Sequence, residues 1–482
     1  MRLDEYVEYD AVALGGLVRE REVSASELTT LACAAADTVN GELNAIVEIF
    51  ESAISDSNAS QESIFSGVPC FKKDLGALIK NCGYESGSRL TSGIKTPVTD
   101  DFSTRMLASG LQIVGRATCS EFGASITTEG IANGATRNPW DVERSAGGSS
   151  GGSSALVAAG VVPIAHTNDG GGSSRIPASI CGNVGMKVSR GMVSQSPNAN
   201  ELTSPLVSEL CNSRTVRDTA AFLDVVGKQS AGEGIYKGMN RDFTFLEQLS
   251  QAPRQYKVAF SGEGWGAKPM DSHARSEVER VASLLSELGH QMEEVTPEVV
   301  TSGRYWQHLQ TLITFFTYSQ IDFWSDLLRV EPGGDNVEPV TLKLFEAGST
   351  ISAIEHAKAW RYMNKVSRSL GAFFQQYDLL LTPTVNQITP FIGSDLALSS
   401  DLPLCEWFEL LRGYVPQSPI ANATGIPAIS VPVASWGNGL PLGMQFFGAM
   451  GAESTLLDIA RQLEVATPWV HRRPIVFSVS GD

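Results

Sequence analysis

The 482-residue sequence contains no long hydrophobic run. Its longer apolar stretches, such as residues 155–162, are far shorter than the roughly 20 residues that a membrane-spanning helix needs and are interrupted by glycine. The N-terminus is acidic from the start and does not resemble a signal peptide. The sequence therefore predicts a soluble, cytoplasmic protein that has no membrane partner.

Basic residues are also scarce. The chain has 36 Lys and Arg against 53 Asp and Glu, which gives a formal net charge of -17. A surface this acidic repels polyphosphates, so nucleic acid and anionic membranes are poor partners. The charge favours solubility and does not indicate a particular function.

The sequence lacks paired cysteines and the common cofactor motifs. The seven cysteines are an odd number, are widely scattered and include no CxxC pair, which argues against a disulfide framework and a zinc knuckle. No HExxH, no GxxxxGK[ST] and no GxGxxG followed by a helix is present. We therefore expect no metal and no cofactor.

The order of the predicted strands and helices is typical of an α/β protein. Residues 10–60 show helical spacing of apolar residues, and from about residue 64 short apolar runs alternate with Gly- and Ser-rich turns and helices. We expect helices over 300–375, a strand at 257–260 and buried strands at 377–385 and 426–433. The predicted segments are an N-terminal helical segment (1–60), a core (61–225), a variable region with a helical, aromatic-rich cap (226–395) and a C-terminal part of the core (396–482).

The segment SAGGSSGGSS at 145–154 is nine-tenths Gly and Ser. Such composition is common in flexible linkers, but here apolar runs lie on both sides. A Gly-rich loop between core elements brings backbone close to a ligand or adopts positive φ. We favour a functional site that includes Ser149.

A second Gly-rich stretch, HTNDGGGSSRIPAS (166–179), places three glycines directly before Ser173. Successive glycine peptides can turn several N–H groups toward one point and so stabilise an oxyanion. A serine at the end of such a turn is a candidate nucleophile, and it needs a base. Lys72 and Lys73 end a predicted strand, and alternation allows only one of them to face a site.

Together these stretches resemble the amidase signature family. GVPCFKKD (67–74) is similar to the strand that carries the family's catalytic lysine, AGGSSGGSSALVAAG (146–160) to its Gly/Ser signature, and NDGGGSSRIPASICGNVGMK (168–187) to its third signature. The match is continuous over 65–190 and looser toward both ends. The resemblance implies a three-layer α/β/α sandwich with a large mixed, mainly parallel central sheet.

The resemblance also implies a Ser–cisSer–Lys triad. Ser173 would attack a carbonyl, Ser149 beside a cis peptide bond would relay the proton, and neutral Lys73 would be the base. The N–H groups of Gly170, Gly171, Gly172 and Ser173 would form the oxyanion hole. The implied product is an acyl-enzyme that water then hydrolyses.

Residues around the nucleophile depart from the usual family pattern. Many members carry Thr-Asp-Thr before the glycines, whereas this chain has Asn168-Asp169-Gly170. The stretch resembles that of two groups of members, namely those that act on cyclic nylon oligomers and those called urethanases. We therefore expect a small-molecule amide, anilide, carbamate or ester as the substrate. Asp169 and Arg175 are expected to orient the loop, with Ser150 nearby; an ordinary Asp–Arg ion pair is the equal alternative.

Two alternative functions and the assembly stay open. GGSSG matches the nucleophile elbow of α/β-hydrolases, with Ser149 or Ser150 as nucleophile and a later histidine as base, but no late histidine has suitable flanking residues. A glutaminase subunit of a tRNA-dependent amidotransferase would share the fold and the triad. The assembly is also open, with a homodimer as one alternative.

Overall fold

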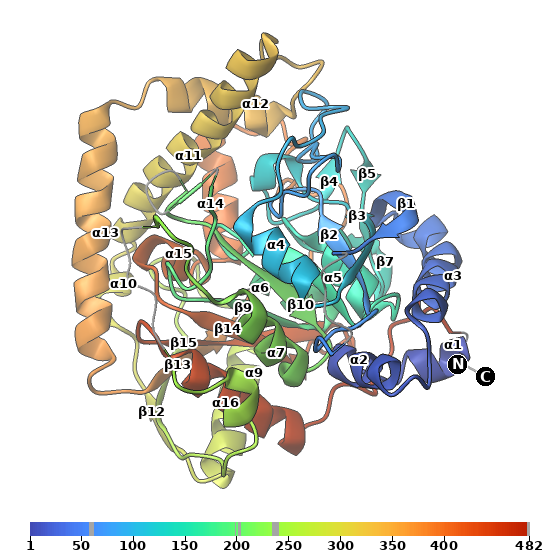
Figure 1. Cartoon of the computed structure of the whole chain (residues 1–482). Helices are drawn as coiled ribbons and strands as arrows, with labels where there is room; N and C mark the ends of the chain where they lie inside the picture. The colour runs from blue at the N-terminus through green and yellow to red at the C-terminus, as the bar shows by residue number, and fades with distance from the viewer. Residues whose placement is uncertain (57–61, 198, 201–203, 234–240, 480–482) are drawn as a thin grey trace.

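The computed structural model describes residues 1–482 except for 57–61, 198, 201–203, 234–240 and 480–482. Among the described residues, eleven strands form one mixed sheet that runs through the molecule (Figure 1). Their spatial order is β1 (Ile46–Ile54), β3 (Gln112–Ala117), β2 (Pro69–Lys73), β8 (Ile164–Asp169), β10 (Ser208–Ser213), β9 (Val184–Lys187), β14 (Ala428–Ser435), β15 (Pro441–Gly448), β13 (Leu379–Pro383), β11 (Lys257–Phe260) and β12 (Gln291–Glu294). Two small ribbons pair β4 (Glu129–Gly130) with β5 (Gly134–Ala135) and β6 (Arg137–Asn138) with β7 (Asp141–Ser145).

The prediction of a large mixed sheet is confirmed, but the expectation that it is mainly parallel is wrong. Within the described sheet, six of the ten strand pairings are antiparallel. Two features account for three of these six pairings. β14 and β15 form a hairpin across residues 436–440, and β10 inserts between β8 and β9, antiparallel to both. Short hairpin connections join antiparallel strands, whereas parallel strands need long crossovers.

Helices cover both faces of the sheet, as expected of an α/β/α sandwich. On one face α5 (Gly151–Ala158) and α6 (Arg175–Cys181) contact each other and the middle strands. On the other, α7 (Val216–Val226) packs on α16 (Glu453–Ala466). Their buried apolar side chains and those of the sheet form one continuous hydrophobic cluster, because each element hides one apolar face from water.

The N-terminal segment is helical only in part. α1 (Leu3–Tyr6) and α2 (Ala11–Arg19) precede α3 (Ala25–Leu43), which begins at a capping box of Ser24 and Glu27. The prediction of helices over residues 10–60 is wrong for residues 46–54. They form edge strand β1, because IVEIFESAI is rich in β-branched and aromatic residues and pairs with β3.

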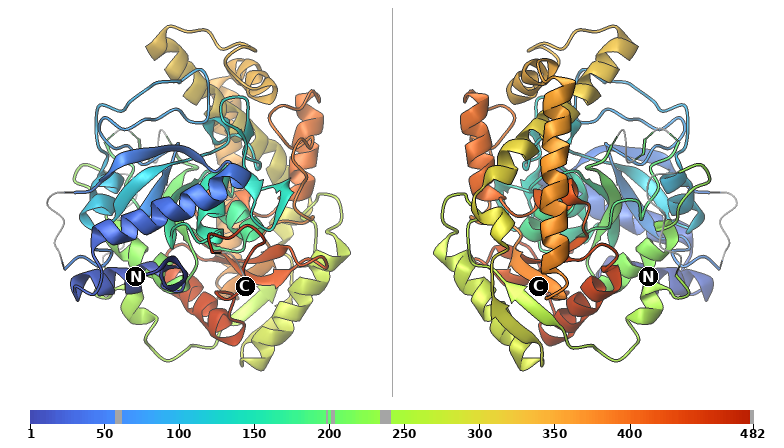
Figure 2. Two further views of the ribbon diagram at one scale, coloured as in Figure 1. Left: turned by 90° about the vertical axis from the view of Figure 1, so that its right-hand side faces the viewer. Right: turned by 90° about the vertical axis from the view of Figure 1, so that its left-hand side faces the viewer.

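The aromatic-rich region forms the predicted helices. They are α10 (Glu298–Thr301), α11 (Arg304–Leu328), α12 (Pro339–Ser349) and α13 (Ala353–Phe373), and the later α14 (Leu404–Tyr414) and α15 (Pro419–Thr424) lie close by. Figure 2 shows α13 as the long orange helix in front of this layer in its right-hand view. The remaining helices are α4 (Asp101–Ala108), η1 (Glu121–Gly123), α8 (Phe245–Gln248) and α9 (Ser272–Glu287). Strands β11 to β13, from the 226–395 segment, lie in the same sheet as the core strands; the expected segment boundaries stay a prediction.

Candidate active site

Lys73 lies at the end of β2, a fully buried strand between two parallel neighbours. Its Nζ is 2.6 Å from Ser149 Oγ and 2.7 Å from Asn168 Oδ1. The preceding Lys72 is also buried, yet its Nζ donates to the carbonyl oxygen of Gly83. The two adjacent lysines therefore reach different partners, and Lys73 is the one beside the Gly/Ser signature.

Burial sets the charge state of this lysine. Its side chain has no solvent exposure, and the resulting desolvation lowers the pKa of Lys73 to about 8. Desolvation disfavours the ammonium form because a buried cation loses its hydration. A substantial fraction of the amine is thus neutral near physiological pH and able to accept a proton.

Ser149 stands directly after a cis peptide bond with Gly148. A side chain at Gly148 would lie 2.7 Å from the carbonyl oxygen of Ser125, so only glycine fits this close approach. The Ser149 carbonyl oxygen accepts from the Ser120 N–H at 3.1 Å, and the side chain is almost fully buried. Ser150 is buried too, and its Oγ donates to the carbonyl oxygen of Asn168.

The glycine turn 170–172 follows β8 and leads into α6, with Ser173 at its end. Gly172 has φ +120°, a conformation that favours glycine. Ser173 is 8% exposed, against 1% for Ser149 and 0% for Lys73. Its Oγ makes no hydrogen bond to any described residue, so it is the most accessible and least engaged of the three groups.

The carboxylate of Asp169 organises this turn. It accepts from the Gly172 N–H at 2.7 Å and from the Ser174 N–H at 3.3 Å. The Gly172 N–H already donates to Asp169 and is therefore not free to bind an oxyanion, contrary to the sequence-based expectation. The N–H groups of Gly170, Gly171 and Ser173 make no hydrogen bond to another described group and stay the candidates for an oxyanion hole.

Arg175 holds Asp169 with two hydrogen bonds, Nε to Oδ2 at 2.9 Å and Nη2 to Oδ1 at 3.0 Å. Burial alone would raise the pKa of Asp169, but the Arg175 guanidinium, together with hydrogen bonds from Asn422 and Gly172, holds it at about 2. The guanidinium also donates to the Ser418 carbonyl oxygen and to the Asn422 and Gln445 side chains. The pair is fully buried and holds the turn through these hydrogen bonds; a role in orienting the loop for catalysis stays a prediction.

Sequence reasoning missed three polar neighbours of Lys73. Asn168 accepts from its amine, His166 Nδ1 accepts from its backbone N–H at 3.2 Å, and Glu209 lies 2.7 Å from His166 Nε2. The NDGGGS departure from the family pattern pointed to Asn168, and alternation along β8 puts His166 on the same face. Glu209 had no local signal, since only the pairing of β10 with β8 sets it opposite Asn168.

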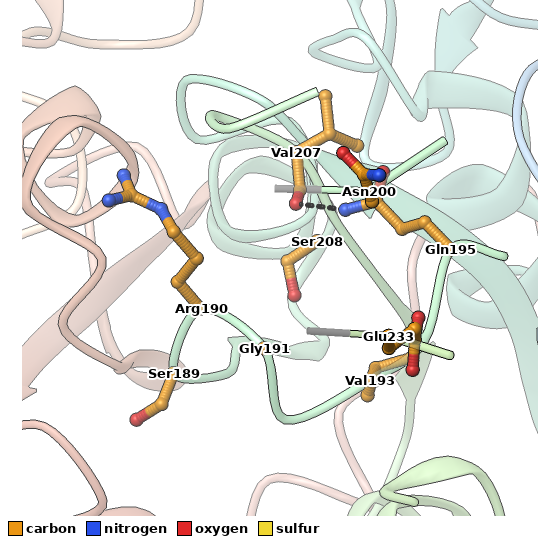
Figure 3. Close-up of a pocket in the computed structure, with 9 residues that line it drawn as sticks. All are labelled: Ser189, Arg190, Gly191, Val193, Gln195, Asn200, Val207, Ser208 and Glu233. Carbon is orange, nitrogen blue, oxygen red and sulfur yellow. Dashed lines mark hydrogen bonds between the residues drawn. The ribbon is translucent and has the colours of Figure 1, made fainter. Parts of the chain in front are cut away.

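A small polar pocket flanks the turn. Figure 3 shows its lining residues, which are Ser189, Arg190, Gly191, Val193, Gln195, Asn200, Val207, Ser208 and Glu233. Val207 adjoins the turn, because a side chain at Gly170 would lie 3.5 Å from its Cγ2. Arg190 points away from the pocket in Figure 3 and donates to the carbonyl oxygens of Pro205, Asn422 and Ala423. Its guanidinium therefore binds neighbouring backbone carbonyl groups and does not face the pocket.

Two further findings bear on the class of protein. In the described part of the chain, no group of three or more His, Cys, Asp and Glu side chains is placed to bind a metal ion. No helix among the described residues combines the length and the apolar character needed to cross a bilayer.

Comparison with known proteins identifies the family. The model of the Amidase family matches residues 27–457. The 6-aminohexanoate-cyclic-dimer hydrolase of Paenarthrobacter ureafaciens is 34% identical over 98% of this chain and 97% of its own length. The putative amidase AmiC of Mycobacterium tuberculosis is 33% identical over 97% of this chain and 96% of its own.

Solved structures show the same relationship. A 6-aminohexanoate cyclic dimer hydrolase complexed with substrate superposes with a TM-score of 0.88 at 30% identity, covering 98% of this chain and 99% of that one. A glutamyl-tRNA(Gln) amidotransferase subunit from Thermotoga maritima superposes with a TM-score of 0.77 at 26% identity, covering 100% and 98%.

The chain belongs to the amidase signature family. It is a hydrolase that acts on carbon–nitrogen bonds other than peptide bonds. The α/β-hydrolase alternative is thereby set aside, and the contact of Ser149 with a lysine in place of a histidine agrees with this outcome.

Proposed function

We propose that this enzyme hydrolyses small amides through Ser173, Ser149 and Lys73. The observation that carries the proposal is the 2.6 Å contact between the buried Lys73 amine and Ser149 Oγ. A buried amine with a pKa of about 8 can accept a proton from a hydroxyl at that distance.

In the proposed first step, Ser173 Oγ bonds to the substrate carbonyl carbon. Its proton passes to Ser149 Oγ while the Ser149 proton passes to Lys73 Nζ, which becomes an ammonium. The carbonyl oxygen gains the negative charge and is stabilised by the N–H groups of Gly170, Gly171 and Ser173.

The C–N bond then breaks. The ammonium of Lys73 returns its proton through Ser149 to the leaving nitrogen, which departs as an amine, and an ester of Ser173 remains. Water attacks this acyl-enzyme by the same proton route, releases the carboxylic acid and restores the resting enzyme.

For the substrate, the similarity to 6-aminohexanoate-cyclic-dimer hydrolases favours cyclic and short linear amides of ω-amino acids as the first group to test. Anilides, carbamates and activated esters share the reacting carbonyl and form the second group. We propose the cytoplasm as the location and a homodimer as the assembly.

A screen of the purified chain tests the proposal. Cyclic amide dimers, aryl anilides, aryl carbamates and aryl esters are offered to the wild type, with Ser173→Ala as the blank. Turnover of at least one amide by the wild type and none by the variant supports the proposal. Turnover that survives in the variant would remove Ser173 from the mechanism.

A glutaminase subunit is a second candidate, favoured by the full-length superposition on the amidotransferase structure. The net charge of -17 makes docking beside tRNA less favourable unless a partner supplies a basic surface. Co-purification with a second protein, together with glutamine hydrolysis that depends on that protein, would support this candidate. Efficient hydrolysis of unrelated amides by the isolated chain would count against it.

A further inference from the structure

Lys73 is held at both its backbone and its side chain by one ring of hydrogen bonds. The Lys73 N–H donates to His166 Nδ1 at 3.2 Å, and His166 Nε2 is 2.7 Å from Glu209 Oε2. On the other side, Asn168 Nδ2 lies 3.5 Å from Glu209 Oε1 and Asn168 Oδ1 lies 2.7 Å from Lys73 Nζ. The ring starts and ends at the same lysine, and all four residues are buried.

Donation runs from Lys73 along both arms of the ring and converges on Glu209. Because His166 Nδ1 accepts a backbone N–H, its proton is on Nε2, which donates to Glu209. Asn168 Nδ2 also donates to the carbonyl oxygen of Leu75 at 3.2 Å, which fixes the amide with Oδ1 toward Lys73. The amine therefore always meets an acceptor on this side.

This direction aims the lone pair of the lysine. A neutral amine that donates one N–H to Asn168 Oδ1 has its lone pair directed elsewhere on the nitrogen, and Ser149 Oγ is 2.6 Å away. Proton transfer from Ser149 needs that lone pair in line with the hydroxyl. An acceptor at position 168 thus favours the orientation that a base requires.

We propose that Asn168, Glu209 and His166 are positioning residues that hold the Lys73 amine in the orientation and charge state needed to accept the proton of Ser149. The inference deepens the proposed function and rests on it. The three residues act through Lys73 and do not contact the reacting carbonyl.

The charge of Glu209 matters as well as its geometry. Burial lowers the pKa of Lys73, whereas Cys119, Glu209 and Asp169 oppose that effect. Burial raises the pKa of Glu209 to about 8, and Lys73 opposes it. Other charged groups that face the ring are Lys72 and Asp100, which both act on His166.

Two isosteric variants separate positioning from plain structural support. Asn168→Asp places a carboxylate beside the amine, so the ammonium is favoured and the rising limb of the pH–kcat profile moves to higher pH by about one unit or more. Glu209→Gln removes the negative charge that this side chain gains as the pH rises through its pKa of about 8, so the upper part of the limb moves to lower pH. At pH 7, Asn168→Asp is expected to lose about tenfold in kcat and to recover it at alkaline pH.

The titration of Lys73 is also measured directly. Protein labelled with [ε-13C]lysine is followed by NMR from pH 6 to pH 11, and the Lys73 signal is assigned by its loss in Lys73→Ala. The same opposite shifts are expected in the two variants. Glu464→Gln, which removes a partly buried carboxylate that accepts from the Val216 N–H, is the control and leaves both profiles unchanged.

The outcomes are distinct. Opposite shifts of the Lys73 signal and of the kcat limb support the inference. Folded variants, checked by circular dichroism, whose kcat falls without any shift of either profile would overturn it, because the ring would then be only structural. If the wild type hydrolysed no amide, the proposed function would fail, and the NMR titration would still decide whether the ring tunes Lys73.

Discussion

Replacement of Arg175 by methionine is expected to expose how much the fold depends on one buried ion pair. Arg175→Met keeps much of the apolar stem but leaves the Asp169 carboxylate in an apolar interior without its cation. Breaking a buried pair by removing one partner costs about 3–5 kcal/mol. We expect a loss of that size in the free energy of unfolding at neutral pH.

The pH dependence of this loss follows from Asp169. Its pKa of about 2 in the fold, against an ordinary 3.8, corresponds to about 2.5 kcal/mol of stability. Because the folded pKa is depressed, the wild type has this contribution above pH 4 and loses it as the pH falls toward 2. In Arg175→Met, burial is no longer opposed by the guanidinium and raises the pKa of Asp169, so protonation relieves the variant as the pH falls.

Urea unfolding at neutral pH and at about pH 4 measures both effects, at protein concentrations low enough to avoid precipitation around the pI of 4.9. The deficit of Arg175→Met is expected to shrink on the acidic side, and the double variant Asp169→Asn/Arg175→Met is expected to be less destabilised at neutral pH than Arg175→Met. Arg275→Met, which breaks half-exposed ion pairs, is the control and should cost about 0–1 kcal/mol. A deficit for Arg175→Met no larger than that of the control, or one independent of pH, would refute the reasoning.

Three further outcomes are expected for the active site. Ser173→Ala is expected to abolish amide hydrolysis while the thermal unfolding midpoint stays close to that of the wild type; a dead and unfolded variant would not support a nucleophile. Ser149→Ala and Lys73→Ala are each expected to lower kcat by about three orders of magnitude or more, with the double variant little worse than either, since relay and base act as a unit; additive losses would contradict a relay. The wild-type kcat is expected to rise with pH and to reach half its maximum near pH 8, because burial lowers the pKa of Lys73 to about 8 and only the neutral amine is a base; a flat profile between pH 6 and pH 10 would contradict Lys73 as the base.

The linear sequence determined the chemistry that is local in the chain. The Gly-rich stretches predicted unusual backbone, and the structure places Gly147 and Gly172 at positive φ and Gly148 in close approach to the Ser125 carbonyl oxygen. Strands β11 and β14 follow from short apolar runs bounded by turn residues.

Only the tertiary structure decided which distant groups meet. Residues 73 and 149 are in contact because β2 and the loop before α5 end at the same place beside β8. The antiparallel insertion of β10 sets Glu209 opposite Asn168, and no periodicity in either strand announces that register. Strand direction and register depend on the packing of the whole sheet and on connection lengths, so the sequence alone could indicate the lysine but not the ring of polar groups that holds it.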